Sequence, residues 1–461
     1  MASRLLAGAL LVAAGVLAWL AITSTLAARA LQAIVGISVV YVGYLALRGW
    51  GFMRAAIAGA GVESETAAMD ARAGSVAGPP VLPFVSVVVP ARNEATVIGA
   101  IVGDLVSQRY PSSPAPGFEV VVIDDGSTDE TAAIAREAAI AREAAQGTSP
   151  LEGILHVMSR PYTAGGSTKG AALAAGTATV RGEVIGVVDA DARVAPDFLA
   201  RISAAWRRDP EAAAIQARRQ PGNAERSWLT KAQGEEQLMD LASQCGRRAV
   251  EGTAELRGNG MFVRRAALEH VGGWSPRAVT EDLDLSTRLA AAGYHVALAP
   301  EVTVSEEAVE SLRALWWQRM RWAEGSLRRL MELGPRLIAG SAPLARKADF
   351  LAFAGEFVIP PLFAASVVAS LLTVPLPVRM DWTVPVSLFA GYGLGSLLLA
   401  LAGLAGTGVG GLALVGRSLR GALFLSHWLV VVPAALAWIA IGPSSMAFRQ
   451  TARAGHQPPA S

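Results

Sequence analysis

Charged residues are scarce in this sequence. They make up 17% of its 461 residues, whereas hydrophobic residues make up 52%, and soluble proteins carry about 25% charge. This composition excludes a fully soluble chain, because so few charges cannot cover an ordinary water-exposed surface, and part of the chain must lie in lipid. A net charge of only +2 and an aromatic content of 6% also argue against a nucleic-acid partner.

Cysteine is nearly absent as well. The single Cys245 has no partner within the chain, so the sequence contains no disulfide framework and is compatible with a reducing compartment. A free buried thiol is the expected state of this residue.

Apolar runs, by contrast, are long. Five segments reach the roughly 20 residues that a helix needs to cross a bilayer. Two are N-terminal and three are late in the chain: Arg4 to Arg29, Arg29 to Arg48, Phe357 to Val378, a stretch from near Val384, and Gly421 to Phe448. The first resembles a signal peptide, since "LAARA" offers small residues for cleavage, but a second span follows at once and favours a membrane anchor.

Flanking charges predict the orientation of these spans. Arg4, Arg48 and Arg54 border the first pair, which places both ends of that hairpin, and the region between the two membrane portions, in the cytoplasm of a cell-membrane protein. A predicted loop with Arg417 and Arg420 falls on the same side. The basic tail after the last span fits this topology less well, so the number of C-terminal spans stays open.

Five regions follow from these boundaries. They are an N-terminal transmembrane hairpin (1–54), a linker (55–80), a soluble domain with interfacial helices at its end (81–340), a C-terminal transmembrane bundle (341–448) and a tail (449–461). The soluble domain alternates apolar strands, "VSVVVP", "EVVVIDDGS" and "VIGVVDAD", with helical patterns. This alternation predicts an α/β fold with a mostly parallel sheet and helices on both faces.

Polar side chains gather where the three predicted strands end. Ligands bind at this edge of such a sheet, and the residues concerned are Arg92, Asn93, Glu94, Asp124, Asp125, Asp189 and Asp191. Asp189 and Asp191 lie two apart and can project to one side of an extended chain, where they repel unless a cation neutralises them. Mg²⁺ or Mn²⁺ with diphosphate oxygens suits such a pair. Taken separately, each motif also fits an ordinary turn.

Five motifs in order carry a family resemblance. "VVVPARNE", "VVVIDDGSTDET", "DAD", "TEDLDLSTRL" and "QRMRW" together resemble the membrane-bound family 2 glycosyltransferases, which include cellulose, hyaluronan and poly-N-acetylglucosamine synthases. The resemblance implies a GT-A nucleotide-sugar-binding domain at 81–340 and transfer of a sugar, with inversion, from a UDP-sugar.

The resemblance also implies roles for single residues. Asp189 and Asp191 resemble the metal pair, and Lys169 resembles the basic residue before the family's small-residue helix, where Ala174 departs from the frequent Asn. Residues implied in nucleotide-sugar binding are Pro90, Glu94, Asp124, Asp125, Lys169 and Asp189. Those implied at the diphosphate and acceptor are Gln318, Arg321 and Trp322, and the loop residues Gly258 and Asn259 are expected on the acceptor side or in a simple turn.

The stretch "TEDLDL" is where we expect the catalytic base. Thr280 suits a helix cap, and Asp282 then lies in the first turn, where the helix dipole favours the ionised carboxylate. Glu281 and Asp284 compete for the role, and three acidic residues that merely complement the dipole are the alternative. The family match favours Asp282, with Glu281 beside it.

The acceptor separates the remaining hypotheses. "ELRGNGMFVRRAALEHVGGW" and "QRMRWAEG" are most similar to the glucosyldiacylglycerol synthases of the family, which implies glucose transfer to diacylglycerol or another lipid. A processive polysaccharide synthase is the alternative, although the late spans contain few polar residues besides His427 and a sugar channel requires more. A non-catalytic membrane scaffold is a remote alternative, and a nucleotidyltransferase lacks its Gly-rich loop here. The sequence does not indicate an oligomeric state.

Overall fold

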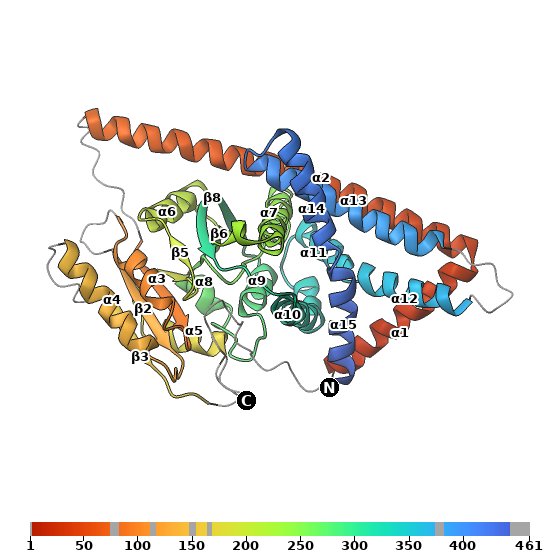
Figure 1. Cartoon of the computed structure of the whole chain (residues 1–461), viewed down its shortest axis with the longest axis horizontal. Coiled ribbons are helices and arrows are strands. Elements are labelled where there is room, and N and C mark those ends of the chain that lie inside the picture. The colour runs from red at the N-terminus through yellow and green to blue at the C-terminus, as the bar shows by residue number, and fades with distance from the viewer. Residues whose placement is uncertain are drawn as a thin grey trace.

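A mixed sheet lies beside a group of apolar helices (Figure 1). The computed structural model describes residues 2–73, 83–110, 117–146, 154–163, 168–373 and 382–442. Within these ranges the strand order is β3-β2-β1-β4-β7-β6-β8-β5. The strands are β1 (Val85–Ala91), β2 (Phe118–Asp124), β3 (Leu155–Ser159), β4 (Val184–Val187), β5 (Arg193–Val194), β6 (Ala214–Pro221), β7 (Met261–Arg264) and β8 (Val296–Glu306).

The register of the parallel strands brings their carboxyl ends together. β1 pairs in parallel with β2 and β4, and Ala91 lies opposite Asp124 at the last position of both strands. β2 with β3 and β6 with β8 are parallel too, whereas β7 and β5 pair antiparallel with their neighbours. The predicted mostly parallel α/β sheet is therefore confirmed, and the edge where β1, β2 and β4 end is a shared one.

Helices cover both faces because side chains alternate along each strand. Val87 and Val89 of β1 pack on the side of α3 (Ile98–Val106) and α6 (Phe198–Arg208). Val88 faces the other side, with α5 (Lys169–Thr177) and α9 (Glu281–Ala291). The remaining helices of this part are α4 (Thr131–Gln146), η1 (Ala224–Arg226), α7 (Trp228–Ala249), α8 (Arg265–His270) and α10 (Leu312–Ala339).

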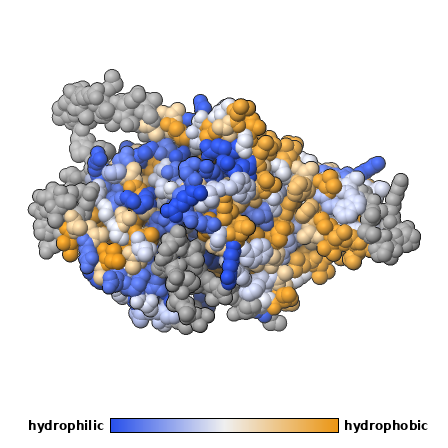
Figure 2. Space-filling view, in the orientation of Figure 1, coloured by the Kyte–Doolittle hydropathy of each residue, from blue (hydrophilic) through white to orange (hydrophobic). Residues whose placement is uncertain are grey.

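In the part of the chain that the structure describes, five stretches of helix are long and apolar enough to cross a membrane, two N-terminal and three C-terminal, as predicted. They are Ala2–Thr23 (α1), Thr25–Ala60 within α2 (Thr25–Ala73), Leu344–Thr373 with α11 (Leu344–Glu356) and α12 (Ile359–Thr373), Thr383–Gly406 (α13), and Gly411–Ile441 with α14 (Gly411–Leu425) and α15 (Trp428–Ile441). Hydrophobic side chains dominate the surface over these helices, on the right of Figure 2. This distribution of hydrophobic side chains is the one expected for a protein whose helical end is embedded in a membrane.

Several predicted boundaries differ from the structure. The third span begins at Leu344 instead of Phe357, and the fifth begins at Gly411 instead of Gly421, so Arg417 and Arg420 lie in helix α14 and not in a loop. The predicted linker 55–80 is helical up to Ala73, because its Ala-rich sequence favours continuation of α2. Residues 74–80 and the tail at 449–461 lie outside the described residues.

Close glycine contacts join the apolar helices to the sheet part. A Cβ at Gly49 of α2 would lie 2.0 Å from the carbonyl oxygen of Ala242 in α7, and a Cβ at Gly246 of α7 would lie 2.2 Å from that of Leu45. Gly403 of α13 meets α7 in the same way, 2.3 Å from the Leu238 oxygen. The backbone of α7 therefore packs directly against the backbones of α2 and α13 and joins these helices to the sheet.

We expect Gly49→Ala to destabilise the protein, because the added methyl group cannot fit against the α7 backbone. Overpacking of this kind costs about 1–3 kcal/mol. Replacing glycine by alanine in a helix gains about 1 kcal/mol of helix propensity, so the overpacking cost outweighs the gain when it is near 3 kcal/mol. Thermal unfolding of the detergent-solubilised chain measures the effect. Gly51→Ala on the same helix is the matched control, since no atom lies within 4 Å of a Cβ there. Equal unfolding temperatures for the two variants would contradict the packing argument.

Candidate active site

One continuous cavity of about 1300 Å³ starts at the carboxyl edge of β1, β2 and β4 and extends between the membrane helices. Its sheet end is lined by Pro90, Arg92, Glu94, Asp125, Tyr162, Lys169, Asp189, Asp191 and Gly258. Its middle is lined by Glu281, Asp282, Gln318, Arg321 and Trp322, and its far end by Val35, Ser38, Tyr392, Ser396, Leu399 and Val432. The structure thus brings most of the predicted site residues to one space, although they come from segments far apart in the sequence.

At the sheet end an arginine and an aromatic ring meet. The guanidinium carbon of Arg92 lies 3.9 Å from the ring centroid of Tyr162, and Asp125 Oδ1 lies 3.1 Å from Arg160 Nε. Gly126 has φ +69, and a Cβ there would lie 2.6 Å from the Tyr162 nitrogen. Only glycine lets the turn after β2 approach the end of β3 this closely. Sequence reasoning missed Tyr162 because it did not recognise "LHVMS" as a strand.

The two neighbouring aspartates after β2 have different surroundings. Asp125 lines the cavity, whereas Asp124 accepts hydrogen bonds from the Ser127 nitrogen (3.0 Å) and Ser159 Oγ (3.1 Å). Asp124 is buried and does not appear on the cavity wall. Its contacts stabilise the turn that presents Asp125, so Asp124 fits a structural role better than the predicted nucleotide contact.

Lys169 connects three segments at the middle of the cavity. Its Nζ lies 2.6 Å from Asp189 Oδ1 and 3.3 Å from Glu281 Oε1, and it donates a hydrogen bond to the Gly258 oxygen at 2.8 Å. Burial alone would lower the pKa of Lys169, but Asp189 and Glu281 together raise it above its ordinary value. The ammonium therefore stays charged and holds the end of β4, the loop before β7 and helix α9 at one point.

Asp189 and Asp191 both line the cavity after β4. Buried Asn259 accepts a hydrogen bond from the Asp189 nitrogen (3.1 Å) and donates one to Glu306 Oε2 (3.0 Å). Asn259 thus orients the Asp189 backbone from behind and, unlike Gly258, is not part of the cavity wall. Among the described residues no three His, Cys, Asp or Glu side chains converge as a metal cage. The carboxylate pair fits a hard dication that completes its shell with water and phosphate oxygens.

Helix α9 presents its first acidic residues to the cavity. Asp284 Oδ2 accepts from Ser275 Oγ and pairs with Arg288 at 2.6 Å, which occupies this carboxylate structurally. Burial raises the pKa of Asp282 and of Glu281, the opposite of the dipole effect that we predicted, because desolvation outweighs it here. Thr280 is at the N-cap position but its side chain makes no capping hydrogen bond. It packs instead on Gly325 of α10.

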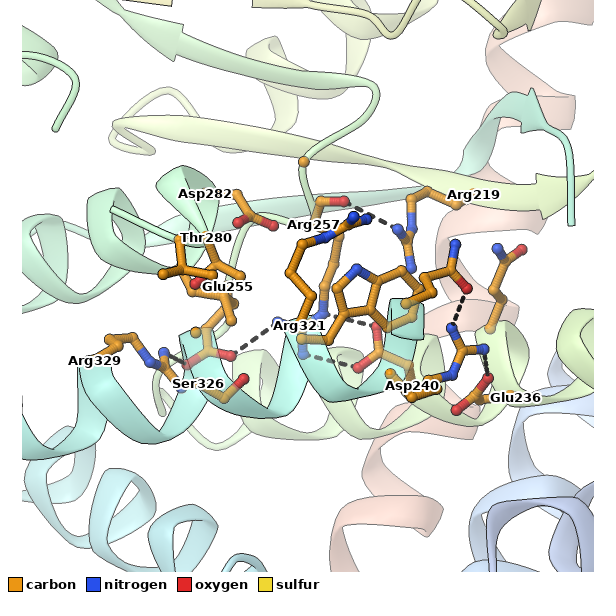
Figure 3. Close-up of a pocket in the computed structure, with 18 of the residues that line it drawn as sticks. Arg219, Glu236, Asp240, Glu255, Arg257, Thr280, Asp282, Arg321, Ser326 and Arg329 are labelled. Atoms are coloured by element: carbon orange, nitrogen blue, oxygen red, sulfur yellow. Dashed lines mark hydrogen bonds and ion pairs between the residues drawn. The ribbon is translucent and has the colours of Figure 1, made fainter. Parts of the chain in front are cut away.

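Helix α10 carries the predicted "QRMRW" residues to the same space. Gln318 Oε1 accepts from Arg319 Nη1 at 2.7 Å, and Arg319 pairs with Glu236 and lies 4.2 Å from the Trp322 ring centroid. These contacts fix the orientation of the Gln318 and Trp322 side chains on the cavity wall. Figure 3 shows Arg321 projecting from α10 into the space that Asp282 also faces. Burial lowers the pKa of Arg321, and Glu281 and Asp189 counteract this effect.

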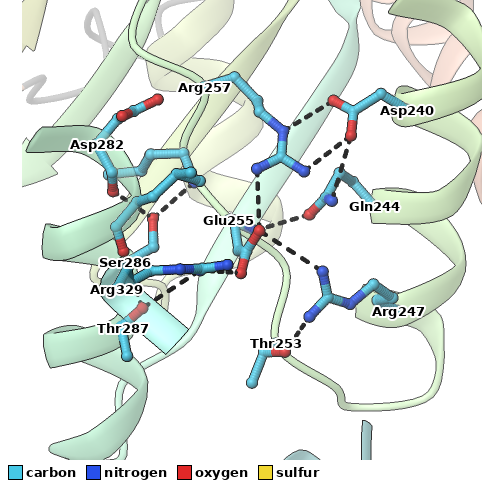
Figure 4. Close-up of polar contacts among 12 residues, drawn as sticks. Asp240, Gln244, Arg247, Thr253, Glu255, Arg257, Asp282, Ser286, Thr287 and Arg329 are labelled. Carbon is cyan, nitrogen blue, oxygen red and sulfur yellow. Dashed lines mark hydrogen bonds and ion pairs between the residues drawn. The ribbon is translucent and has the colours of Figure 1, made fainter. Parts of the chain in front are cut away.

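A buried ionic cluster supports the cavity floor (Figure 4). Glu255 lies 2.9 Å from Arg257 Nη1 and 3.6 Å from Arg247 Nη1, and it also pairs with Arg329. Burial would raise the pKa of Glu255, but the three arginines hold it at about 2. Arg257 in turn pairs with Asp240 of α7 at 2.8 Å. Sequence analysis missed this cluster because its members are dispersed over nearly 90 residues without a motif.

The fold and the cavity at its sheet edge define an enzyme with a GT-A domain beside helices that are long and apolar enough to cross a membrane. Comparison with known proteins gives the family. A model described as "Glycosyl transferase family group 2" matches residues 184–441, and one described as "Glycosyl transferase family 2" matches residues 86–272. The chain belongs to glycosyl transferase family 2 and is a hexosyltransferase, which confirms the predicted family.

Relatives and a solved structure agree with this assignment. The chain is 33% identical to a beta-monoglucosyldiacylglycerol synthase of Nostoc sp., over 81% of this chain and 77% of the relative, and 33% identical to one of Synechocystis sp., over 80% and 74%. The mannosyltransferase PcManGT from Pyrobaculum calidifontis, solved with GDP-Man and Mn²⁺, is similar with a TM-score of 0.51 and 20% identity. The matched region covers 86% of this chain and 99% of the PcManGT chain. This similarity supports the GT-A fold.

We expect Glu255→Gln to destabilise the protein strongly. The substitution removes the one carboxylate that Arg247, Arg257 and Arg329 share within the described residues, and loss of one partner from a buried ion pair costs about 3–5 kcal/mol. Thermal unfolding of the solubilised protein is the measurement. Glu225→Gln is the control, because Glu225 pairs with Lys231 at an exposed position, where a salt bridge contributes about 0–1 kcal/mol. Similar losses in both variants would refute a special role for the cluster.

Proposed function

We propose that the protein transfers glucose from UDP-glucose to diacylglycerol or a similar lipid in the membrane. The observation that carries the proposal is the single cavity, which runs from the carboxyl edge of the sheet to the space between α2 and α13. A soluble donor and a lipid acceptor can meet in it without the acceptor leaving the bilayer. The glucosyldiacylglycerol synthases among the relatives use an acceptor of this kind, as their names state.

The donor occupies the sheet end in this proposal. Asp125 accepts hydrogen bonds from the nucleoside, and Tyr162 with Arg92 offers a flat surface beside it. Asp189 and Asp191 would hold a divalent ion, which neutralises charge on the diphosphate when it is bound. Arg321 supplies a second positive charge to the departing nucleotide from the opposite wall. Pro90, Glu94, Lys169 and Gly258 complete the walls of this subsite.

Asp282 serves as the base. Its carboxylate accepts the proton of the acceptor hydroxyl while the hydroxyl oxygen forms a bond to the anomeric carbon and the bond to the UDP oxygen breaks, which inverts that carbon. A pKa raised by burial makes Asp282 a stronger base than an exposed aspartate. Glu281 is less suited, since its carboxylate is paired with Lys169.

The acceptor occupies the membrane end. Val35, Leu399 and Val432 supply apolar surface for acyl chains, and Ser38 and Tyr392 supply hydroxyls near the head group. The sequence led us to expect few polar groups in the spans, but the structure also places Glu356, Tyr392 and Ser396 on the cavity wall. This observation favours a second candidate, a processive polysaccharide synthase whose chain moves along these polar groups.

We place the catalytic domain in the cytoplasm. Arg48 Nη2 donates a hydrogen bond to the Ala249 oxygen of α7 at 3.1 Å, and Arg328 of α10 lies 3.4 Å from Ser3. Both ends of the N-terminal hairpin are thus on the side of the sheet. The basic residues at these ends favour the cytoplasmic side, where nucleotide sugars are available.

We expect Asp282→Asn to lower kcat by about 10²–10⁴-fold, because the amide cannot accept the proton. Steady-state transfer by the purified protein, with UDP-glucose binding measured separately, tests this role. Asp284→Asn is the matched control two residues along the same helix, and it should retain turnover, since the Asp284 carboxylate is held by Ser275 and Arg288. Loss of turnover in Asp284→Asn with activity kept in Asp282→Asn would reverse the assignment.

The acceptor is tested with labelled sugar. Membranes containing the protein are incubated with labelled UDP-glucose or UDP-N-acetylglucosamine, with and without chelator, and extracted with chloroform. We expect label from UDP-glucose in the organic phase as a single-sugar lipid, and none when the divalent ion is removed. Label retained as an insoluble polymer would support the polysaccharide synthase instead, and label transfer that persists with chelator would exclude the metal site.

A further inference from the structure

A second cavity, separate from the catalytic one apart from a shared arginine, lies between the sheet and the membrane helices. It has a volume of about 520 Å³ and is formed by β6, η1, α7, the α13–α14 connection and α14. Its charged lining consists of Arg218, Arg219, Lys231, Arg417 and Arg420 against Glu225 and Glu235. Arg219 is paired with Glu306 at 3.6 Å outside this lining. The other four cations face Glu225 and Glu235 alone among the lining carboxylates, so the lining keeps an excess of positive charge.

The distribution of ion pairs shows where this charge is available. Buried Glu235 is shared by Arg417 (3.1 Å) and Arg420 (2.7 Å), so one carboxylate serves two guanidinium groups. Within the described ranges, Lys231 has an ion pair with the highly exposed Glu225 alone. The Nε of Arg218 is buried and has no hydrogen-bond partner among the described residues. An anion in the cavity would satisfy these groups.

The cavity is also at membrane level. Helix α13, a candidate span, ends at Gly406, and Thr407 and Val409 directly after it line the cavity. Helix α14 exposes large apolar residues on one face and carries its arginines on another; the apolar ones are Leu412, Val415, Leu419 and Leu423. A helix of this kind has its apolar face against acyl chains and its charged face toward polar groups. Arg417 and Arg420 then lie at the depth of lipid head groups.

We propose that this cavity binds the phosphoryl head group of an anionic membrane lipid. Basic pockets beside transmembrane helices are suited to such head groups, and each cation near the surface adds to the attraction. Because the lipid would contact α7 and α14 at once, it would fix the catalytic domain against the bilayer. Inorganic phosphate offers the same chemistry without the membrane anchor, so the test includes it.

The experiment is a titration of the full-length, detergent-solubilised protein with lipids, followed by native mass spectrometry. We expect phosphatidylglycerol to bind and phosphatidylcholine not to bind. The double variant Lys231→Gln/Arg417→Gln keeps the Arg420–Glu235 pair and should bind phosphatidylglycerol about 30-fold more weakly, since two surface cations are lost. Lys231→Gln alone changes only a rim residue and should weaken binding about 5-fold.

Arg54→Gln is the matched control, because Arg54 is an exposed cation on α2 that does not line the cavity. Its affinity for phosphatidylglycerol should equal that of the wild type. Equal binding of the two lipids, or an equal loss in Arg54→Gln and Lys231→Gln, would overturn the proposal. Full displacement of phosphatidylglycerol by millimolar inorganic phosphate would also overturn it, because the site would then belong to a soluble anion.

Discussion

The catalytic end of this protein depends on one ammonium group. Lys169 contacts Asp189, Glu281 and the backbone of Gly258, and these residues belong to three different segments of the chain. Two acidic residues from different elements would repel in a buried space. The lysine converts that repulsion into attraction, and it therefore sets the position of Asp189 relative to the helix that carries Asp282.

A second buried charge also brings together groups of opposite charge from several segments. Glu255 draws Arg247, Arg257 and Arg329 together below the cavity (Figure 4), and Arg247 reaches Asp349 of α11 at 3.0 Å. Charge alternates along this path from the sheet edge to a membrane helix. Since each buried charge needs its partner, movement of the membrane helices relative to the sheet would leave charges unpaired. Close packing at Gly49 and Gly246 also joins α7 to α2.

Local patterns predicted much of this arrangement. Strand ends, helix periodicity and apolar length indicated the α/β sheet, the edge with Asp125 and Asp189, and two plus three spans. Long-range effects were not predictable in this way. The separation of Asp124 from Asp125 depends on Ser159, which comes from a strand that the pattern did not reveal. The raised pKa of Asp282 depends on burial by several elements, whereas its sequence position indicated only the helix dipole.

Burial of Asp282 and access for a membrane-bound acceptor explain why the proposed site lies where the sheet and the membrane helices meet. The proposed base has a pKa raised by its dry environment, and in the proposed reaction the hydroxyl of a membrane-bound acceptor approaches it from the bilayer side. The cavity fits both conditions, because Gly325 of α10 packs on Thr280 beside Asp282, and the far end of the cavity is lined by Val35 and Leu399 of the membrane helices. A GT-A domain released from its helices would lose this far wall. In the proposed mechanism the membrane helices thus form one wall of the active site in addition to anchoring the protein.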